Sequence, residues 1–302
     1  MSVNNDTQFF GRVLTAMVTP FDGGGKVDYE AAARLARHLA DNGSDGLVVS
    51  GTTGESPTLT SEEKVCLFRT IRQAVAPNVR VLAGTGSYDT AETIHLSQEA
   101  EKAGVDGLLL VTPYYNRPSQ AGMYAHFRAV AESVKVPIML YNVPPRTAVN
   151  LEAATVFRLA EISNIVAIKE ASKSMEQVAE IILGTPDNFA VYSGDDGVTL
   201  PILALGGAGV VSVTSHVAGP NLHEMHTKFF AGDLAAARAI HLRTIALTKA
   251  LFSVPSPVPT KTALQILGVL PNCNVRLPLI DADESERAAI QSALKEYGLL
   301  SS

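Results

Sequence analysis

The sequence predicts an α/β fold, a (β/α)8 TIM barrel with a small C-terminal helical extension. Two observations predict it. A short run of valine, isoleucine and leucine recurs eight times, and a helical pattern lies between successive runs. After the eighth run the alternation stops, and only helical patterns follow. Eight such units are typical of a closed parallel barrel, and 302 residues suit one barrel with an appendage.

The expected strands are apolar throughout, as strands buried on both faces of a parallel sheet are. They span residues 13–18, 46–50, 79–84, 107–111, 137–141, 165–169, 189–193 and 208–213. The helices between them are expected at 29–41, 61–75, 90–102, 120–134, 151–162, 174–183 and 197–205. An open doubly wound sheet is the structural alternative. It is weakened because no Gly-x-Gly-x-x-Gly motif follows the first strand.

The extension is predicted from four further helical patterns, at residues 221–231, 233–252, 260–267 and 284–297. Between the second and third of these, residues 254–260 are too rich in proline to be helical. We therefore expect a barrel over residues 1–225 and a helical extension over residues 226–302. We also expect the extension to pack between subunits.

Composition excludes several classes of protein. Apolar residues make up 46% of the chain and charged residues 18%, which is globular rather than disordered. The net charge is −6 and no basic stretch stands out, so we expect no nucleic-acid partner. Cys66 and Cys273 lie in no metal or redox motif and are expected to be reduced thiols of a cytosolic protein.

No membrane partner is expected either. The N-terminal residues have neither the basic region nor the apolar run of a secretory signal. Residues 197–221 contain no charged residue, which is long enough to span a bilayer. Their glycines and polar residues instead predict two buried elements joined by a glycine turn. The protein is therefore expected to be cytoplasmic.

Chemistry in such barrels takes place at the C-terminal ends of the strands, on the loops that follow. Polar residues gather at five of these expected positions, which should meet on one rim. They are Gly51-Thr-Thr-Gly-Glu55, Thr112-Pro-Tyr-Tyr-Asn116, Tyr141-Asn-Val-Pro-Pro-Arg-Thr147, Lys169-Glu170 and Ser193-Gly-Asp-Asp196.

Lys169 is the most informative single residue, because it ends a strand that is otherwise apolar. Burial disfavours the charged form of a lysine. The neutral amine is the form that attacks a ketone to give an imine. The alternative is a buried lysine that pairs with Glu170 or with another carboxylate.

The other rim residues each allow two interpretations. Gly51-Thr-Thr-Gly-Glu55 is either a tight turn or a nest for a carboxylate made of N–H and hydroxyl groups. Tyr114, Tyr115 and Tyr141 are either packing residues or proton shuttles beside a reactive lysine. Arg146 is either half of a surface ion pair or a clamp for a carboxylate.

The sequence resembles the dihydrodipicolinate synthase and N-acetylneuraminate lyase superfamily. The resemblance runs from about Gly11 to the C-terminal helices. Within the superfamily, Arg146 and Tyr115 favour the dihydrodipicolinate (4-hydroxy-tetrahydrodipicolinate) synthases, because the sialic acid lyases lack the Pro-Pro-Arg-Thr pattern. The motifs that carry the resemblance are Gly51-Thr-Thr-Gly-Glu-Ser56, Thr112-Pro-Tyr-Tyr-Asn116, Tyr141-Asn-Val-Pro144 and Ile168-Lys-Glu170.

The resemblance implies a class I (Schiff-base) lyase of lysine and diaminopimelate biosynthesis. Lys169 would form an imine with pyruvate, and the derived enamine would attack L-aspartate-4-semialdehyde. No metal or organic cofactor is implied, because the imine is the electron sink. Tyr141 would be the central acid and base, and Thr52 and Tyr115 would complete its proton relay.

The resemblance also implies binding residues and an assembly. The pyruvate carboxylate would be held by Thr53, helped by Gly194 and the backbone at Val211. Arg146 would bind the carboxylate of the semialdehyde. Tyr115 would reach the active site of a neighbouring subunit, which implies a homo-oligomer, and a tetramer built as a dimer of dimers is expected.

Two competing hypotheses remain open. One is another Schiff-base aldolase of this fold, acting on N-acetylneuraminate or a 2-keto-3-deoxy sugar acid. It would keep Lys169 and Tyr141, but its substrate offers no second carboxylate to Arg146. The other is a catalytically silent binding protein, since a fold does not guarantee activity.

Feedback by lysine is expected to be weak or absent. Ser61 and Lys64 stand where lysine-inhibited bacterial members often carry histidines, and Tyr88 replaces an asparagine. The charge of Lys64 would repel the ammonium group of the effector. Three other residues of the family's lysine pocket are present, namely Ser56, Glu92 and Tyr114.

Overall fold

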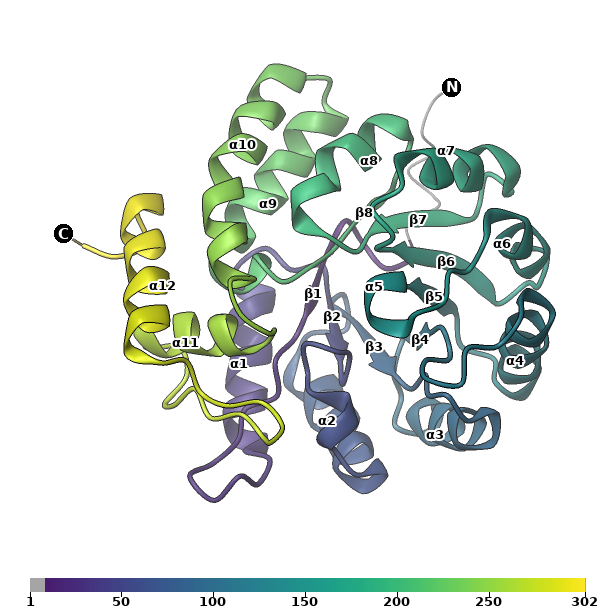
Figure 1. Cartoon of the computed structure of the whole chain (residues 1–302), viewed down its shortest axis with the longest axis horizontal. Helices are drawn as coiled ribbons and strands as arrows, with labels where there is room; N and C mark the ends of the chain where they lie inside the picture. Colours follow the sequence, from purple (N-terminus) through teal and green to yellow (C-terminus); the bar gives the residue numbers. More distant parts are fainter. Residues whose placement is uncertain (1–8, 302) are drawn as a thin grey trace.

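The computed structural model describes residues 9–301. Eight parallel strands form a closed barrel in which β8 pairs with β1 (Figure 1). The eight predicted strands are confirmed, with bounds that differ by at most two residues. They are β1 (Val13–Ala16), β2 (Gly46–Val49), β3 (Arg80–Gly84), β4 (Gly107–Val111), β5 (Ile138–Asn142), β6 (Ile165–Glu170), β7 (Ala190–Ser193) and β8 (Gly209–Ser212).

Helices surround the barrel, as predicted. The larger apolar core lies between them and the outer faces of the strands. The helices are α1 (Tyr29–Asp41), α2 (Ser61–Ala74), α3 (Thr90–Lys102), α4 (Gln120–Ser133), α6 (Ala153–Ala160), α7 (Met175–Gly184) and α8 (Thr199–Leu205). Two short helical turns were not predicted, η2 (Ser56–Thr58) and α5 (Pro144–Thr147). The start of the helix predicted at 197–205 is a separate turn, η3 (Asp196–Val198).

The helix starts follow from capping residues in the sequence. Asp28, Asp89, Ser119 and Ser174 each accept a hydrogen bond from a backbone N–H of the first helical turn that follows. Thr60 forms a capping box at the start of α2. Its side chain accepts from the N–H of Glu63, and the side chain of Glu63 accepts from the N–H of Thr60. These caps fix where each helix leaves the loop that precedes it, and those loops carry the site.

A second apolar cluster fills the inside of the barrel. Met139 of β5 and Ala167 of β6 belong to it. Side chains two residues apart on a strand point to the same face. Tyr141 and Lys169 therefore point into the barrel from its C-terminal end, and Tyr141 belongs to the same cluster.

The extension consists of α9 (Ser215–Phe230), α10 (Leu234–Leu251), α11 (Val258–Ile266) and α12 (Glu284–Tyr297). Helix α9 begins earlier than expected, because a first turn precedes a kink at Ala218 and Pro220 follows it. The prediction that residues 254–260 are non-helical is wrong for Val258–Thr260. Proline is tolerated in the first turn of a helix, and Pro259 lies there.

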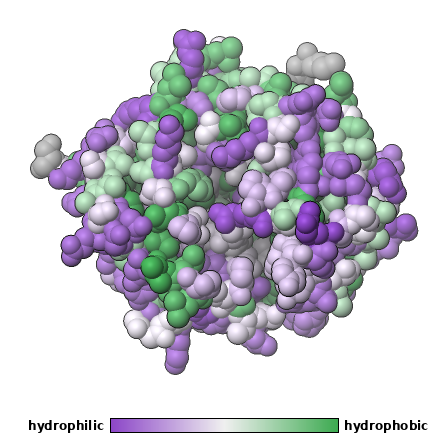
Figure 2. Space-filling model, viewed as in Figure 1, coloured by the Kyte–Doolittle hydropathy of each residue, from purple (hydrophilic) through white to green (hydrophobic). Residues whose placement is uncertain are grey.

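In Figure 1, α11 and the loop after it lie on the same side of the barrel as α1. This loop contacts the segment before α1, where the Nδ2 of Asn274 donates to the carbonyl of Asp22. Figure 2 shows a band of hydrophobic residues over this region, whereas much of the rim of the same face is hydrophilic. Leu277 and Ile280 of this loop are exposed. The division at residues 225 and 226 falls inside α9 and stays a prediction, as does packing of the extension between subunits.

The uncharged segment 197–221 holds a helix and a strand, as expected. Gly206, which has a φ of 113°, ends α8, and β8 follows at once. No helix formed by residues 9–301 combines the length and hydropathy needed to cross a membrane.

Candidate active site

Lys169 and Tyr141 form the centre of the site. They are register partners on the neighbouring strands β6 and β5. Lys169 is 6% exposed, and its Nζ lies 4.2 Å from the centre of the Tyr141 ring. Gly194, after β7, completes the enclosure, because a Cβ there would lie 3.1 Å from Cγ of Lys169. The lysine stem is therefore packed between an aromatic ring and a bare backbone.

Glu170 does not pair with Lys169. Its carboxylate accepts hydrogen bonds from the Nδ2 of Asn142 at 3.0 Å, the Nε2 of Gln177 at 3.0 Å and the N–H of Ser172 at 2.7 Å. The two side chains leave β6 on opposite faces. Among residues 9–301, Lys169 takes part in no ion pair. The alternative of a structural lysine paired with Glu170 is therefore wrong.

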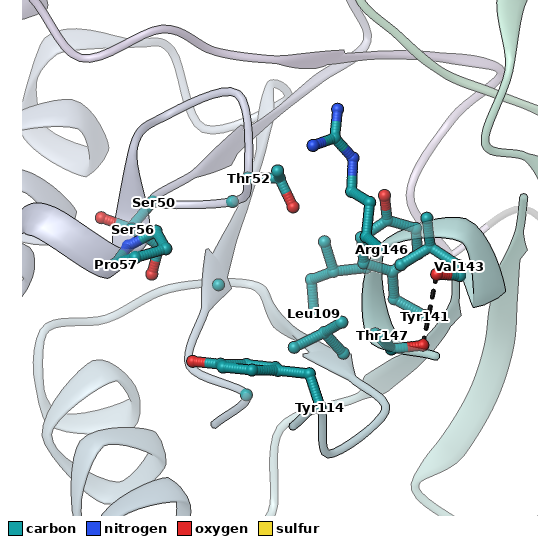
Figure 3. Close-up of a pocket in the computed structure, with 14 residues that line it drawn as sticks. Ser50, Thr52, Ser56, Pro57, Leu109, Tyr114, Tyr141, Val143, Arg146 and Thr147 are labelled. Atoms are coloured by element: carbon teal, nitrogen blue, oxygen red, sulfur yellow. Dashed lines mark hydrogen bonds between the residues drawn. The ribbon is translucent and has the colours of Figure 1, made fainter. Parts of the chain in front are cut away.

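A cavity of about 210 Å³ opens at this end of the barrel (Figure 3). Thr52, Tyr141 and Arg146 line it, so the turn after β2 meets the end of β5 and the helical turn that follows β5 there. Gly84 and Gly86 form part of the wall. A Cβ at Gly84 would lie 2.4 Å from the carbonyl oxygen of Ser50, and one at Gly86 equally close to the N–H of Val111. Only glycine fits where these strand ends come so close.

The turn after β2 presents the two threonines. Thr52 is half-buried and directs its hydroxyl into the cavity, whereas Thr53 is buried (Figure 3). The N–H of Gly54 donates to the carbonyl of Gly51 at 3.0 Å, and the Oγ1 of Thr19 donates to the carbonyl of Gly54 at 2.7 Å. The turn is thus fixed by its own hydrogen bonds and by a residue of the loop that follows β1.

Ser50 is a site residue that the sequence did not suggest. It lines the cavity at a positive φ of 56°, just after β2. Its Oγ is buried and has no hydrogen-bond partner within the described part of the chain. No local pattern marks this serine, because its exposure to the cavity depends on the turn that follows it.

Arg146 lies on α5, a single turn of helix. Its N–H donates to the carbonyl of Val143 at 2.9 Å, and the N–H of Ala148 donates to that of Pro144 at 2.9 Å. Pro144 and Pro145 occupy the first helical turn, where their missing N–H groups cost nothing. The guanidinium is exposed at the mouth of the cavity (Figure 3) and forms no ion pair with residues 9–301.

Tyr115 is the predicted residue that this chain does not bring to the cavity. It is 89% exposed and has a φ of 68°. Its neighbour Tyr114 lines the cavity instead and meets Tyr88 edge-on, with ring centres 5.2 Å apart. Burial raises the pKa of Tyr114.

Four other predicted residues lie near the cavity without forming its wall. Lys169 lies against Tyr141, which does line it, and Gly194 lies against Lys169. Val211 belongs to the same interior cluster as Tyr141. Thr53 is the neighbour of Thr52 in the turn.

Comparison with known proteins finds similar proteins over nearly the whole chain. The model of the "Dihydrodipicolinate synthetase family" matches residues 9–297. A 4-hydroxy-tetrahydrodipicolinate synthase from Moorella thermoacetica is 56% identical, over 96% of this chain and 99% of that protein. The structure of a dihydrodipicolinate synthase from Bacillus anthracis is 52% identical with a TM-score of 0.92, and covers 95% of this chain and 98% of its own.

A dihydrodipicolinate synthase from Cyanidioschyzon merolae, solved with lysine bound, is 50% identical with a TM-score of 0.95. That match covers 97% of this chain and 99% of the other. The matches extend over the barrel and the helical extension alike. The chain therefore belongs to the dihydrodipicolinate synthetase family.

Proposed function

We propose that Lys169 is the residue that forms the Schiff base with pyruvate. The reaction is that of the 4-hydroxy-tetrahydrodipicolinate synthases, in which pyruvate condenses with L-aspartate-4-semialdehyde in lysine and diaminopimelate biosynthesis. One observation carries the assignment of the lysine. Lys169 is buried at the C-terminal end of the barrel, against Tyr141 and without a carboxylate partner among the described residues.

The covalent steps follow from amine chemistry. The neutral amine of Lys169 attacks the keto carbon of pyruvate, and loss of water gives an imine. The imine acidifies the methyl group, and loss of a proton gives an enamine. The enamine carbon bonds to the aldehyde carbon of the semialdehyde. The amino group of that substrate then displaces Lys169 and closes the ring.

Tyr141 and Thr52 would carry protons in these steps. Tyr141 lies level with Lys169 across the β5–β6 pair, and both Tyr141 and Thr52 line the cavity. A hydroxyl group so placed suits general acid and base catalysis. Tyr115 would complete the relay in a neighbouring subunit. Its exposure and left-handed backbone favour a contact outside its own chain.

The two substrate carboxylates would bind at different depths. Thr53, Gly194 and the backbone at Val211 would hold the pyruvate carboxylate near Lys169. Arg146 would bind the carboxylate of the semialdehyde at the mouth, where a planar guanidinium can form two parallel hydrogen bonds. The position of Arg146 on α5 favours this synthase over an aldolase of sugar acids, whose substrates carry hydroxyl groups there.

We also propose an assembly and a compartment. A homotetramer built as a dimer of dimers would bring Tyr115 to a second active site and cover part of the exposed extension. The cytoplasm is proposed because the similar proteins are named as synthases of a small, water-soluble product. Size-exclusion chromatography with light scattering checks the assembly, and a monomer with full activity would contradict it.

A coupled assay with pyruvate and L-aspartate-4-semialdehyde tests the function. Wild type should turn over, and Arg146→Ala should lose most of kcat/KM for the semialdehyde while borohydride still traps pyruvate. Arg128→Ala, on the outer helix α4, is the matched control and should resemble wild type. Trapping without turnover in wild type would indicate a sugar-acid aldolase instead. Neither trapping nor turnover would indicate a silent binding protein.

A further inference from the structure

A buried ion pair joins the extension to the turn that carries Thr52 and Thr53. The Nζ of Lys261, in α11, donates to the Oε1 of Glu55 at 2.5 Å, and both side chains are 1% exposed. The two residues are 206 positions apart in the sequence. Removing two charges from water is costly, so such a pair is retained only where its geometry is good.

The extension holds both oxygens of the Glu55 carboxylate. The Oε2 atom accepts from the backbone N–H of Arg276 at 3.0 Å. Lys261 makes a second hydrogen bond, to the carbonyl of Asn274 at 2.7 Å, and its ammonium lies 4.1 Å from the centre of the Phe21 ring. Burial lowers the pKa of Lys261, and the Glu55 carboxylate acts in the opposite direction. Each of the two charged groups therefore has two hydrogen-bond partners.

The side chain of Arg276 makes hydrogen bonds with the segment that follows Glu55, between β2 and α2. Its guanidinium donates to both carboxylate oxygens of Glu63, at 2.8 and 2.6 Å, and to the carbonyl of Thr58 at 2.7 Å. Glu63 lies in the first turn of α2 and belongs to its capping box. The extension therefore binds both the turn at Glu55 and the start of α2.

Glu55 in turn is locked to Thr52. It ends the turn in a left-handed conformation, and its N–H donates to the carbonyl of Thr52 at 3.1 Å. Its own carbonyl accepts from the N–H and Oγ1 of Thr58, at 2.9 and 3.0 Å. A shift of Glu55 would therefore move Thr52, whose hydroxyl faces the cavity. A displacement of about 1 Å in an active site can cost about a hundredfold in rate.

We propose that Glu55 and Lys261 are positioning residues of the active site. Through this pair, the C-terminal extension holds the turn that presents Thr52 and Thr53 to pyruvate. The proposal rests on the proposed function, because it assumes that the two threonines serve the pyruvate side of the reaction. The extension then belongs to the catalytic apparatus of its own chain.

The test is a double variant, Glu55→Gln with Lys261→Met. It removes both charges, so neither is left buried without a partner. We expect a folded protein whose kcat falls by about a hundredfold, because Thr52 belongs to the proposed proton relay. Its KM for pyruvate should rise by about tenfold or more, because Thr53 holds the pyruvate carboxylate, while its KM for the semialdehyde stays within about twofold. Trapping of pyruvate by borohydride at subsaturating pyruvate should slow in parallel. If the double variant does not fold, Glu55→Asp, which keeps the charge but shortens the side chain, decides by the same ratio of KM values.

Asp106→Asn is the matched control. It breaks the ion pair between Asp106 and Arg72, whose atoms are 2.6 Å apart, at the opposite end of the barrel before β4. It should lower the melting temperature and leave both KM values unchanged. A folded double variant with the wild-type KM for pyruvate would overturn the proposal. A wild type without turnover and without an adduct would instead reject the proposed function, before any variant is compared.

Discussion

The ammonium of Lys169 lies 4.2 Å from the centre of the Tyr141 ring, and the two residues are paired across β6 and β5. The face of the ring attracts the cation. Unlike a carboxylate, the ring does not neutralise the charge. The tyrosine hydroxyl and the lysine amine also face the same interior. A substitution can separate the contact between the ring and Lys169 from the chemistry proposed for the tyrosine hydroxyl.

Tyr141→Phe keeps the ring against Lys169 and removes only the hydroxyl. We expect kcat to fall by about 10² to 10⁴, the usual contribution of a general acid or base. The adduct of pyruvate with Lys169 should still form, more slowly. Steady-state kinetics and borohydride trapping on the same preparation check this. A kcat within a few fold of wild type would remove Tyr141 from the proton relay.

Glu170→Gln tests whether the carboxylate beside Lys169 has a structural role. The carboxylate of Glu170 accepts hydrogen bonds only from neutral groups of Asn142, Gln177 and Ser172 among the described residues. The amide of glutamine would turn a donor toward one of these donors. The free energy of unfolding should fall by about 1 to 3 kcal/mol, measured by urea titration. Trapping of pyruvate should persist, and its loss would show that Glu170 acts on Lys169 after all.

Because three histidines are buried, we expect the free energy of unfolding to decrease in acid. Burial lowers the pKa of His126, His216 and His226 to about 4 each, from the ordinary 6.5. Below pH 6.5 the unfolded chain therefore binds protons that the folded chain does not. Stability should be full above this pH and decline as the pH falls toward 4. Urea unfolding at pH 7 and pH 5 measures the difference.

His216 offers the sharpest variant for this effect. Its Nε2 accepts from the N–H of Val18 at 3.2 Å, which requires the neutral ring. His216→Gln can keep an acceptor there but does not titrate, so stability should depend less steeply on pH. His95→Gln, at an exposed position on α3, is the control and should leave the slope unchanged. Equal slopes in wild type and His216→Gln would contradict the assignment.

Inhibition by lysine should be weak or absent. Burial lowers the pKa of Lys64, and the carboxylate of Glu92 raises it, so the two groups interact. Lys64 thus already supplies a positive charge beside a carboxylate of the expected effector pocket. Turnover should be insensitive to submillimolar L-lysine, and Lys64→His should become more sensitive. Half-inhibition of wild type at submillimolar lysine would refute this.

Local pattern was enough for most of the fold. Strand β4 is a continuous apolar run, and β6 is apolar up to Lys169. Helices such as α1 and α3 begin at residues that cap them, so the bounds of these elements could be read from composition and spacing. Helix α5 could not, because two consecutive prolines indicate a loop unless they fall in a first turn. The same rule explains why the start of α11 was missed.

The site was predictable where strand register decides it, and not where tertiary contacts do. Tyr141 and Lys169 end neighbouring strands, so their meeting follows from the barrel itself. The pairing of Glu55 with Lys261 depends on how the extension folds back, across 206 positions. The one local signal was a single lysine in α11, between Thr260 and Thr262, and a surface position would also have produced it.

The most direct test of the proposed chemistry is to locate the pyruvate adduct. Wild type is reduced with borohydride in the presence of pyruvate, digested, and mapped by mass spectrometry. The pyruvate-derived mass should lie on the peptide that contains Lys169, and Lys169→Ala should gain none. An adduct on Lys261, the other deeply buried lysine, or no adduct at all, would contradict the assignment of Lys169.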